Sequence, residues 1–338
     1  MTESSNNTTQ PEVSILIVGY NTKELVADCL RGLYEYTVGV EFEVLYVDCS
    51  DDGSVQMLAR DFPQVRVIEN NQNLGFGRGN NLLARHAKGK RLLLLNPDTI
   101  ISDNAIGELN ALADSEPDAG AWGGMTVLPD GRVDPGCKQP GPGLKYLVYR
   151  MVGLRSASEA GLSKNADMPQ EVPVLTGAFM MVRRDVWQQL KGFDESFFMY
   201  CEETELCLRI WQSGNRILMT PKSRITHLVG SGSSDSPTRM LAMTKGNRQM
   251  ARKHFGTLHN LCDGVLRWLY SLTRYLAGII LMPIKPDKAR RMRGKHRLVV
   301  FRLQDWWSGW ENTPQSQNSE VSTASETTKP VSSRGDAA

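Results

Sequence analysis

Arg91-Leu-Leu-Leu-Leu-Asn-Pro-Asp98 is an apolar run that ends on a turn sequence and a carboxylate. A short apolar run bounded by a turn is typical of a strand buried inside a parallel sheet. Ligands of open α/β sheets bind where such strands end, and a carboxylate there can hold a hard divalent cation against a phosphate. We therefore expect Asp98 to be a metal ligand. The alternative is that Asn-Pro-Asp is only a turn.

The residues before this run alternate between strand and helix patterns. Strands are predicted at 13–18, 42–47 and 65–68, and apolar residues at helical spacing follow the first strand from Leu25 to Tyr36. The order β-α-β-α-β-α-β predicts a mostly parallel central sheet flanked by helices. The first two strands deliver polar groups, such as Asp48, to the same edge as Asp98.

A glycine-rich segment, Asn73-Leu-Gly-Phe-Gly-Arg-Gly-Asn80, precedes the Arg91 run. Its three glycines allow the backbone to approach a ligand closely, and Asn73 and Arg78 can reach a nucleotide. A plain loop that starts a helix is the alternative interpretation. Farther along the chain, Tyr200-Cys-Glu-Glu-Thr-Glu-Leu-Cys-Leu-Arg209 places three carboxylates at the start of a predicted helix, a position that favours negative charge.

These motifs and several others occur in an order that resembles family 2 glycosyltransferases, and within them the bacterial rhamnosyltransferase-like enzymes. The resemblance covers the chain from residue 13 to about 233 and rests on segments 13–21, 48–54, 73–80, 95–98, 177–179, 192–195, 197–209 and His227. It implies a GT-A fold, a nucleotide-sugar donor, a divalent metal (Mg or Mn) on the diphosphate and inversion at the anomeric carbon.

The resemblance also implies roles for individual residues. Glu203, the second of the acidic pair, would be the base that deprotonates the acceptor hydroxyl, with Glu202 as the alternative. Asp98 and His227 would hold the metal, since neutral imidazole is a competent ligand, although a lone histidine is more often structural. The residues that would bind the donor are Tyr20, Asp48, Asn73, Gly77, Arg78, Pro97 and Asp98.

The chain departs from the family pattern at three places. Glutamate occupies all three acidic positions 202, 203 and 205, where many relatives carry aspartate at the second and third. The turn after Asp48 is one residue shorter than usual, and Gly19 replaces a common asparagine. A turn or helix cap is the alternative role for carboxylates in that segment, with Asp52 and Ser54 as better candidates than Asp48.

Length and composition fit one large α/β domain with an appendage, since the chain has 338 residues and 41% hydrophobic content. The predicted domains are disordered tails at 1–11 and 312–338, a catalytic domain at 12–256 and a helical basic and aromatic segment at 257–311. Within the catalytic domain, 12–127 would bind the nucleotide and 128–256 the acceptor, near a mobile insertion at 136–173.

Charge and cysteine usage exclude some functions. A net charge of +2 argues against general nucleic-acid binding. Six cysteines without a Cys-x-x-Cys pair, and a polar amino terminus without a secretion signal, predict free thiols in a reducing cytoplasm.

The carboxy-terminal segment combines apolar, basic and tryptophan residues. Its uncharged run at 275–284 has ten residues, well short of the roughly 20 that span a bilayer. Residues 285–302 then hold eight Lys or Arg against one acid, Asp287, before Trp306, Trp307 and Trp310. This pattern predicts a helix pair on an anionic membrane surface, peripheral at the inner face of the cell membrane. The alternatives are packing on the catalytic domain or a dimer interface.

Together these observations predict a membrane-associated cytoplasmic glycosyltransferase for cell-surface polysaccharide synthesis. By resemblance it would move rhamnose from dTDP-rhamnose to a glycan or lipid-linked oligosaccharide acceptor. The same fold could use a UDP-hexose or a UDP-N-acetylhexosamine instead. A non-catalytic scaffold of a polysaccharide assembly complex is the alternative from another functional class.

Overall fold

The computed structural model describes residues 10–137, 141–151, 168–228 and 236–310. The predicted tails lie outside these ranges apart from residues 10 and 11, as does much of the predicted insertion at 136–173. The chain divides into two compact units, one ending at Leu228 and one beginning at Val229.

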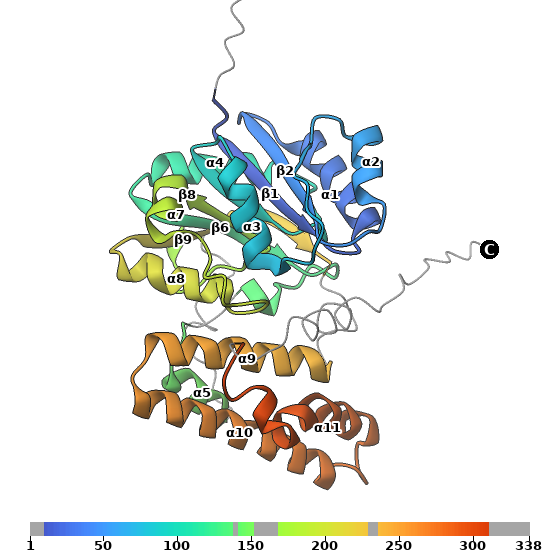
Figure 1. Ribbon diagram of the computed structural model, residues 1–338, viewed down its shortest axis with the longest axis vertical. Coiled ribbons are helices and arrows are strands. Elements are labelled where there is room, and N and C mark those ends of the chain that lie inside the picture. The colour runs from blue at the N-terminus through green and yellow to red at the C-terminus, as the bar shows by residue number, and fades with distance from the viewer. Residues whose placement is uncertain (1–9, 138–140, 152–167, 229–235, 311–338) are drawn as a thin grey trace, which may run out of the picture. The chain divides into compact units, whose positions relative to one another are not determined.

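The first unit is built around one nine-stranded sheet (Figure 1). Eight of the strands follow the order β3-β2-β1-β4-β8-β6-β9-β5, and the ninth, β7, pairs with β9 outside this order. Four parallel strands make up its first half, as the sequence predicts: β3 (Arg66–Val67), β2 (Phe42–Asp48), β1 (Val13–Gly19) and β4 (Arg91–Leu95). In the second half, β8 (Phe179–Arg183) runs antiparallel to both β4 and β6 (Ala119–Val127).

A long last strand completes this sheet. Strand β9 (Arg216–His227) is parallel to β6 and pairs antiparallel with two short strands, β5 (Thr99–Ile100) and β7 (Gln170–Glu171). Because β5 follows Asp98 directly and β9 ends on His227, this pairing brings two of the predicted metal ligands together.

Helices cover both faces of the sheet, which explains why β4 is apolar at every position after Arg91. Leu93 and Leu95 pack with α1 (Lys23–Tyr36), α2 (Ser54–Asp61) and α4 (Ala105–Ser115). Leu92 and Leu94 pack on the opposite face with α3 (Gly75–His86), α7 (Arg184–Leu190) and α8 (Glu202–Gln212). Alternate side chains of a strand point to opposite faces, so a strand covered on both sides is a continuous apolar run. The unit also contains α5 (Leu144–Met151) and a 3₁₀ turn at Pro135–Cys137.

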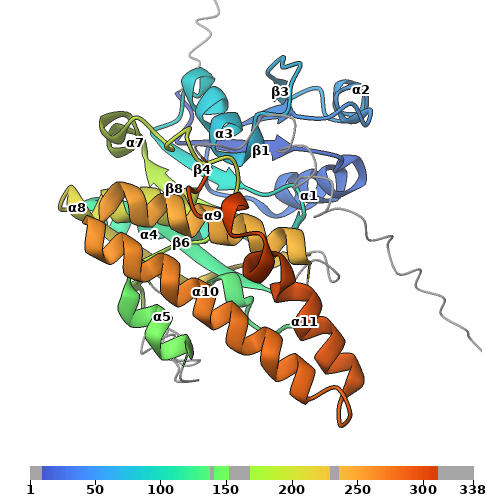
Figure 2. The same ribbon diagram turned by 60° about the horizontal axis from the view of Figure 1, so that its bottom comes forward.

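The second unit consists of α9 (Pro237–His254), α10 (Thr257–Ile280), α11 (Pro286–Phe301) and a 3₁₀ turn at Leu303–Asp305, seen from a second side in Figure 2. Helix α9 belongs to this unit because it packs against α10 and α11. The compact unit that holds the sheet therefore ends at Leu228, before the boundary predicted at 256. Among the described residues, no helix combines the length and apolarity needed to cross a bilayer.

Candidate active site

The turn after β4 lies at the edge of the sheet beside the segment that leads into β8. The Asn96 amide donates a hydrogen bond to the Ala178 carbonyl over 3.1 Å, and the Asp98 carbonyl accepts one from the Leu228 amide over 2.8 Å. Pro97 is buried within this turn. These backbone contacts fix the position from which the Asp98 carboxylate projects.

Asp98, His227 and Asp134 form a short polar chain at this edge. His227 Nδ1 lies 2.9 Å from Asp134 Oδ2, and His227 Nε2 lies 3.3 Å from Asp98 Oδ1. Asp134 is itself held by the Gly136 amide, which donates to its other oxygen over 2.8 Å. The sequence analysis did not identify Asp134, and no motif surrounds it. It reaches the site because the turn after β6 folds back on that strand.

The two carboxylates control the charge of the imidazole between them. Burial alone lowers the pKa of His227, but contact with Asp134 and Asp98 outweighs burial and raises this pKa to about 9. In turn, His227 and the Gly136 amide hold the pKa of Asp134 below its usual value despite burial of the carboxyl group. The raised pKa favours a protonated imidazole between the Asp134 and Asp98 side chains.

The same residues fit a divalent cation. Asp98 Oδ1 is buried and, among the described residues, accepts no well-aligned hydrogen bond, although His227 Nε2 is near. A hard cation prefers such carboxylate oxygens, and Mg²⁺ usually takes only one or two of them beside substrate phosphates. No group of three His, Cys, Asp or Glu side chains in the described part of the chain forms a complete metal cage. The protein donors at this edge are thus Asp98 Oδ1 and, once deprotonated, His227 Nε2.

The first turn of α8 presents its two leading glutamates to different surroundings. Glu202 is 3% exposed, and its Cβ would lie 3.9 Å from a Cβ built on Gly77 of α3. Glu203 is half-buried, and its Cβ would lie 3.7 Å from a Cβ on Gly177. Since Gly177 precedes Ala178, the backbone partner of Asn96, Glu203 lies on the side of α8 nearest to the Asp98 turn.

Burial raises the pKa of Glu202 well above its usual value, and the charge of Glu203 raises it further. The Glu202 Oε2 atom is buried and has no hydrogen-bond partner among the described residues. Both effects favour the protonated form of this carboxyl group over the carboxylate that a general base needs. Of the two candidates, Glu203 has the better position and surroundings for accepting a proton.

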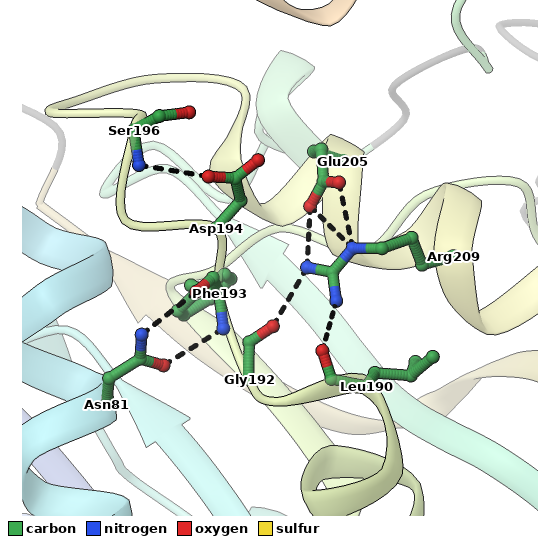
Figure 3. Close-up of polar contacts among 8 residues, drawn as sticks. All are labelled: Asn81, Leu190, Gly192, Phe193, Asp194, Ser196, Glu205 and Arg209. Carbon is green, nitrogen blue, oxygen red and sulfur yellow. Dashed lines mark hydrogen bonds and ion pairs between the residues drawn. The ribbon is translucent and has the colours of Figure 1, made fainter. Parts of the chain in front are cut away.

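The third glutamate of this turn supports the structure (Figure 3). Glu205 is 2% exposed and forms an ion pair with Arg209 at 2.6 Å, and Arg209 also donates to the carbonyls of Leu190 and Gly192. Asn81 of α3 holds the next residue, Phe193, through both its amide and its carbonyl over 2.9 Å each. The segment 192–195 therefore ties α3 to α8 beneath the acidic turn.

The glycine-rich segment differs from its prediction, because its glycines lie in α3 and face protein. Gly75 has φ +70°, and a Cβ there would meet the Phe198 carbonyl oxygen at 2.5 Å. A Cβ on Gly79 would meet Val18 at 2.8 Å, and one on Gly77 would contact Phe193 at 3.4 Å. Close packing thus accounts for Gly75 and Gly79, whereas a Cβ on Gly77 would make an ordinary contact. Arg78 donates two hydrogen bonds to the Glu195 carbonyl instead of projecting freely toward a nucleotide.

The remaining predicted donor-binding residues lie at strand and helix ends. Asp48 pairs with Gly19 in the β1–β2 register, is buried, and accepts hydrogen bonds from the Ser50 amide and hydroxyl. Burial raises the pKa of Asp48. Tyr20 follows β1 and is half-buried. Asn73 accepts a bond from the Gly75 amide, while its buried Nδ2 has no partner in the described part of the chain.

Asp52 stabilises the turn after Asp48, which is the alternative role that the sequence analysis gave for the carboxylates of this segment. It accepts bonds from the Ser54 amide and hydroxyl at the start of α2, and from the Lys23 amide at the start of α1.

Comparison with known proteins gives a consistent family assignment. The family model described as Glycosyltransferase like family 2 matches residues 11–256. The chain is 28% identical over 271 residues to the N-acetylglucosaminyl-diphospho-decaprenol L-rhamnosyltransferase of Mycobacterium tuberculosis, covering 75% of this chain and 86% of that protein. It is 24% identical over 225 residues to rhamnosyltransferase WbbL of Escherichia coli K12, covering 64% and 83%.

Solved structures agree on the fold. The mannosyltransferase PcManGT of Pyrobaculum calidifontis, in complex with GDP-Man and Mn²⁺, aligns with a TM-score of 0.59 at 16% identity, over 89% of this chain and 88% of that one. GalNAc-T7 with UDP, GalNAc and Mn²⁺ aligns with a TM-score of 0.54 at 17% identity, over 85% and 55%. At these identities the likeness supports the GT-A fold alone.

Proposed function

The chain belongs to glycosyltransferase family 2, and from that premise we propose that it transfers rhamnose from dTDP-rhamnose, with inversion, to a lipid-linked acceptor at the inner face of the cell membrane. That it is a transferase follows from the family and from its rhamnosyltransferase relatives. The rhamnosyl donor and the lipid-linked acceptor are suggested by what the M. tuberculosis relative is named for.

One arrangement supports the proposal most. The Asn96 to Ala178 hydrogen bond places the Asp98 turn beside Gly177, and Gly177 lies against Glu203. A candidate metal ligand and a candidate base, about a hundred residues apart in sequence, therefore reach the same edge of the sheet. A Cβ on Gly177 would lie 2.9 Å from the Phe76 ring and 3.7 Å from the Glu203 Cβ, so this glycine lets the Phe76 ring pack beside Glu203.

In the proposed reaction, Glu203 accepts the proton of the acceptor hydroxyl as that oxygen bonds to the anomeric carbon. The bond from the anomeric carbon to the diphosphate oxygen breaks, and the nucleoside diphosphate leaves with the electron pair. The raised pKa of Glu202 favours its protonated form, which makes Glu203 the better candidate for the base. Asp48, Tyr20 and Asn73 would hold the nucleotide at the neighbouring strand ends.

Asp98 and His227 would hold a divalent cation, Mg²⁺ or Mn²⁺, at the diphosphate. When bound, such a cation neutralises the charge that develops on the leaving diphosphate. Asp134 accepts the Nδ1 hydrogen of His227 and so keeps Nε2 directed toward Asp98.

The test is release of nucleoside diphosphate from a panel of dTDP- and UDP-sugars, with Mg²⁺ or Mn²⁺ and a polyprenyl-diphospho-sugar acceptor. Asp98→Ala should reduce release from the preferred donor by about 10³-fold or more. Asp103→Ala, which removes an exposed carboxylate five residues away, is the matched control and should leave release unchanged. Preference for a UDP-sugar would overturn the donor assignment, and equal activity of Asp98→Ala would overturn the site.

A further inference from the structure

Helix α10 has its amphipathic pattern reversed within the helical unit. The residues that it buries are Asp263, Gly264, Ser271 and Gly278, none of them large and apolar. Its large apolar side chains are instead exposed: Leu258 75%, Leu261 52%, Val265 42%, Leu276 46%, Ile279 46% and Ile280 73%. A helix that packs in water normally buries its apolar stripe. The reversal therefore indicates that something apolar covers the outer face of α10.

The buried face of α10 is specifically built for its helical neighbours. Asp263 pairs with Arg248 of α9 at 3.2 Å and with Arg267 at 2.9 Å. Gly264 gives room to the Trp307 ring, since a Cβ there would lie 2.8 Å from it. Gly278 gives room to Arg293 of α11 in the same way. These ion pairs and close contacts determine which side of α10 faces its helical neighbours. They therefore also determine which side is exposed.

Five of these exposed residues lie on one side of α10 and form what we call the α10 stripe: Leu258, Leu261, Val265, Leu276 and Ile279, with the partly buried Leu269 and Leu272 between them. They recur at spacings that place them on one side of a helix. A helix of 24 residues is about 36 Å long, and the apolar surface continues past its end to Ile284, which is 71% exposed. A stripe of this length could contact an extended apolar surface along the whole helix.

The helical unit is also strongly cationic. Residues 237–310 hold fifteen Lys or Arg and three Asp, a net charge of +12, whereas the whole chain carries +2, which leaves −10 for the rest. Lys288, Arg291 and Arg297 of α11 are exposed. A second copy of the unit would bring the same positive charge to the contact. An anionic surface complements it.

We propose that the α10 stripe docks on an anionic lipid surface, with the helix lying in the plane of the headgroups and the exposed cations of α11 at the phosphates. This proposal rests on the membrane location included in the proposed function and adds the face that makes the contact. Apolar side chains enter the boundary between headgroups and acyl chains, and each nearby cation adds electrostatic attraction.

The experiment is flotation of the full chain with vesicles of phosphatidylcholine containing about 30% phosphatidylglycerol, or with phosphatidylcholine alone. Wild type should float with the anionic vesicles and partition much less onto the neutral ones. The triple change Leu261→Gln, Leu276→Gln and Ile279→Gln should weaken partitioning about tenfold or more. The triple change Lys288→Gln, Arg291→Gln and Arg297→Gln should weaken it about a hundredfold on anionic vesicles, with little effect on neutral ones.

Matched controls remove the same kinds of side chain from the sheet unit. Arg31→Gln, Arg60→Gln and Arg132→Gln remove three exposed arginines, and Val38→Gln with Val55→Gln changes two exposed apolar residues. Both sets should float like wild type. Because every changed position is exposed, unfolding temperatures should stay close to that of wild type. Equal loss of flotation in a control set would overturn the assignment of the face.

Two results would refute the docking proposal without touching the proposed chemistry. One is wild type that fails to float while it releases nucleoside diphosphate from its donor. The other is a dimer in light scattering that dissociates when the α10 stripe carries the glutamines. Conversely, flotation that follows the predicted variants, with no transfer to any acceptor, would support the docking surface and refute the transferase assignment of donor and acceptor.

Discussion

Buried polar groups have hydrogen-bond partners in one region, the support beneath α8, and lack them in another, the edge of the sheet beside it. In the support, charged and amide groups form hydrogen bonds and an ion pair within the protein (Figure 3). The residues of the support are Asn81, Leu190, Gly192, Phe193, Glu205 and Arg209. At the edge, Asp98 Oδ1, Glu202 Oε2 and Asn73 Nδ2 are buried without a hydrogen bond among the described residues. Unsatisfied buried groups cost stability, so they persist where a ligand compensates for them.

The difference gives a rule for this molecule. Substitutions in the support should destabilise the fold, whereas substitutions at the edge should change activity or ligand binding and leave the fold intact. Glu203→Gln tests the edge and Arg209→Met tests the support. Asp134→Asn lies between them, and Glu202→Gln is the exception, an edge substitution expected to act on stability.

The largest effect should come from Glu203→Gln at the edge. Loss of a positioned base typically reduces the rate of the chemical step by about 10² to 10⁴-fold, and the unfolding free energy should stay within about 0.5 kcal/mol of wild type. Steady-state transfer to acceptor and a urea titration measure the two quantities. Glu202→Gln should retain most of its activity, because burial raises the pKa of that carboxyl group and favours the neutral form that glutamine resembles. Loss of activity in Glu202→Gln alone would reverse the assignment of the base.

In the support, Arg209→Met should destabilise the protein by about 3–5 kcal/mol, because it leaves the Glu205 carboxylate buried without its cation. Urea denaturation gives the free energy. Arg216→Met is the control, since the side chain of Arg216 is 41% exposed and its ion pair with Glu116 is on the surface. That change should cost less than about 1 kcal/mol. Recovery of stability in Arg209→Met with Glu205→Leu would confirm the mechanism, and equal losses for the two single variants would refute it.

A smaller effect is expected from Asp134→Asn, which lies between the two classes. Asp134 contacts no substrate in the proposed reaction, but it orients His227 through a bond of 2.9 Å. Loss of such an orienting partner should weaken metal affinity about 10 to 100-fold. Mn²⁺ titration followed by electron paramagnetic resonance, in the presence of nucleoside diphosphate, measures affinity without turnover. Asp130→Asn removes a half-exposed carboxylate from the same turn and should not change it.

The smallest effect concerns the pH dependence of stability in Glu202→Gln. The folded-state pKa of Glu202 is raised by burial and by Glu203, so its stabilising contribution is complete in acid and is lost as pH rises toward that raised pKa. Wild type should therefore lose stability relative to the glutamine variant above about pH 4.5, by at most about 1.4 kcal/mol per pH unit. Urea titrations at pH 5 and pH 8 measure the difference. Glu24→Gln, an exposed first-turn glutamate of α1, is the control. A difference that does not change with pH would mean that Glu202 is ionised in the folded state.

The sequence was a good guide where local pattern decides structure. Apolar runs and the alternating order of strand and helix patterns predicted the four parallel strands, because burial on both faces makes β1, β2 and β4 largely apolar. The ends of β2 and β4 place Asp48 and Asp98 at the same edge of the sheet. The family resemblance and the GT-A fold are confirmed by the family model and by the solved structures.

Features that depend on contacts between residues far apart in the chain could not be predicted from the sequence. Asp134 contacts His227 only because β9 brings His227 beside the turn after β6, and no local pattern records that pairing. The glycines of α3 look like a ligand-binding loop, yet the residues that need the space, Phe198 and Val18, lie far away in sequence. The exposed apolar face of α10 could not be predicted for the same reason. The sequence shows that this helix is rich in apolar residues, but it does not show which side of the helix its neighbours bury.

The separation of charge along the chain has a consequence for how the protein would meet its surroundings. With +12 on residues 237–310 and −10 on the remainder, the positive charge of the chain is concentrated in its helical unit. Near an anionic surface, within the Debye length of about 8 Å at physiological ionic strength, the helical unit would be attracted while the remainder would be repelled. Orientation would then precede contact, and raising the salt concentration would slow arrival before it weakened the bound state.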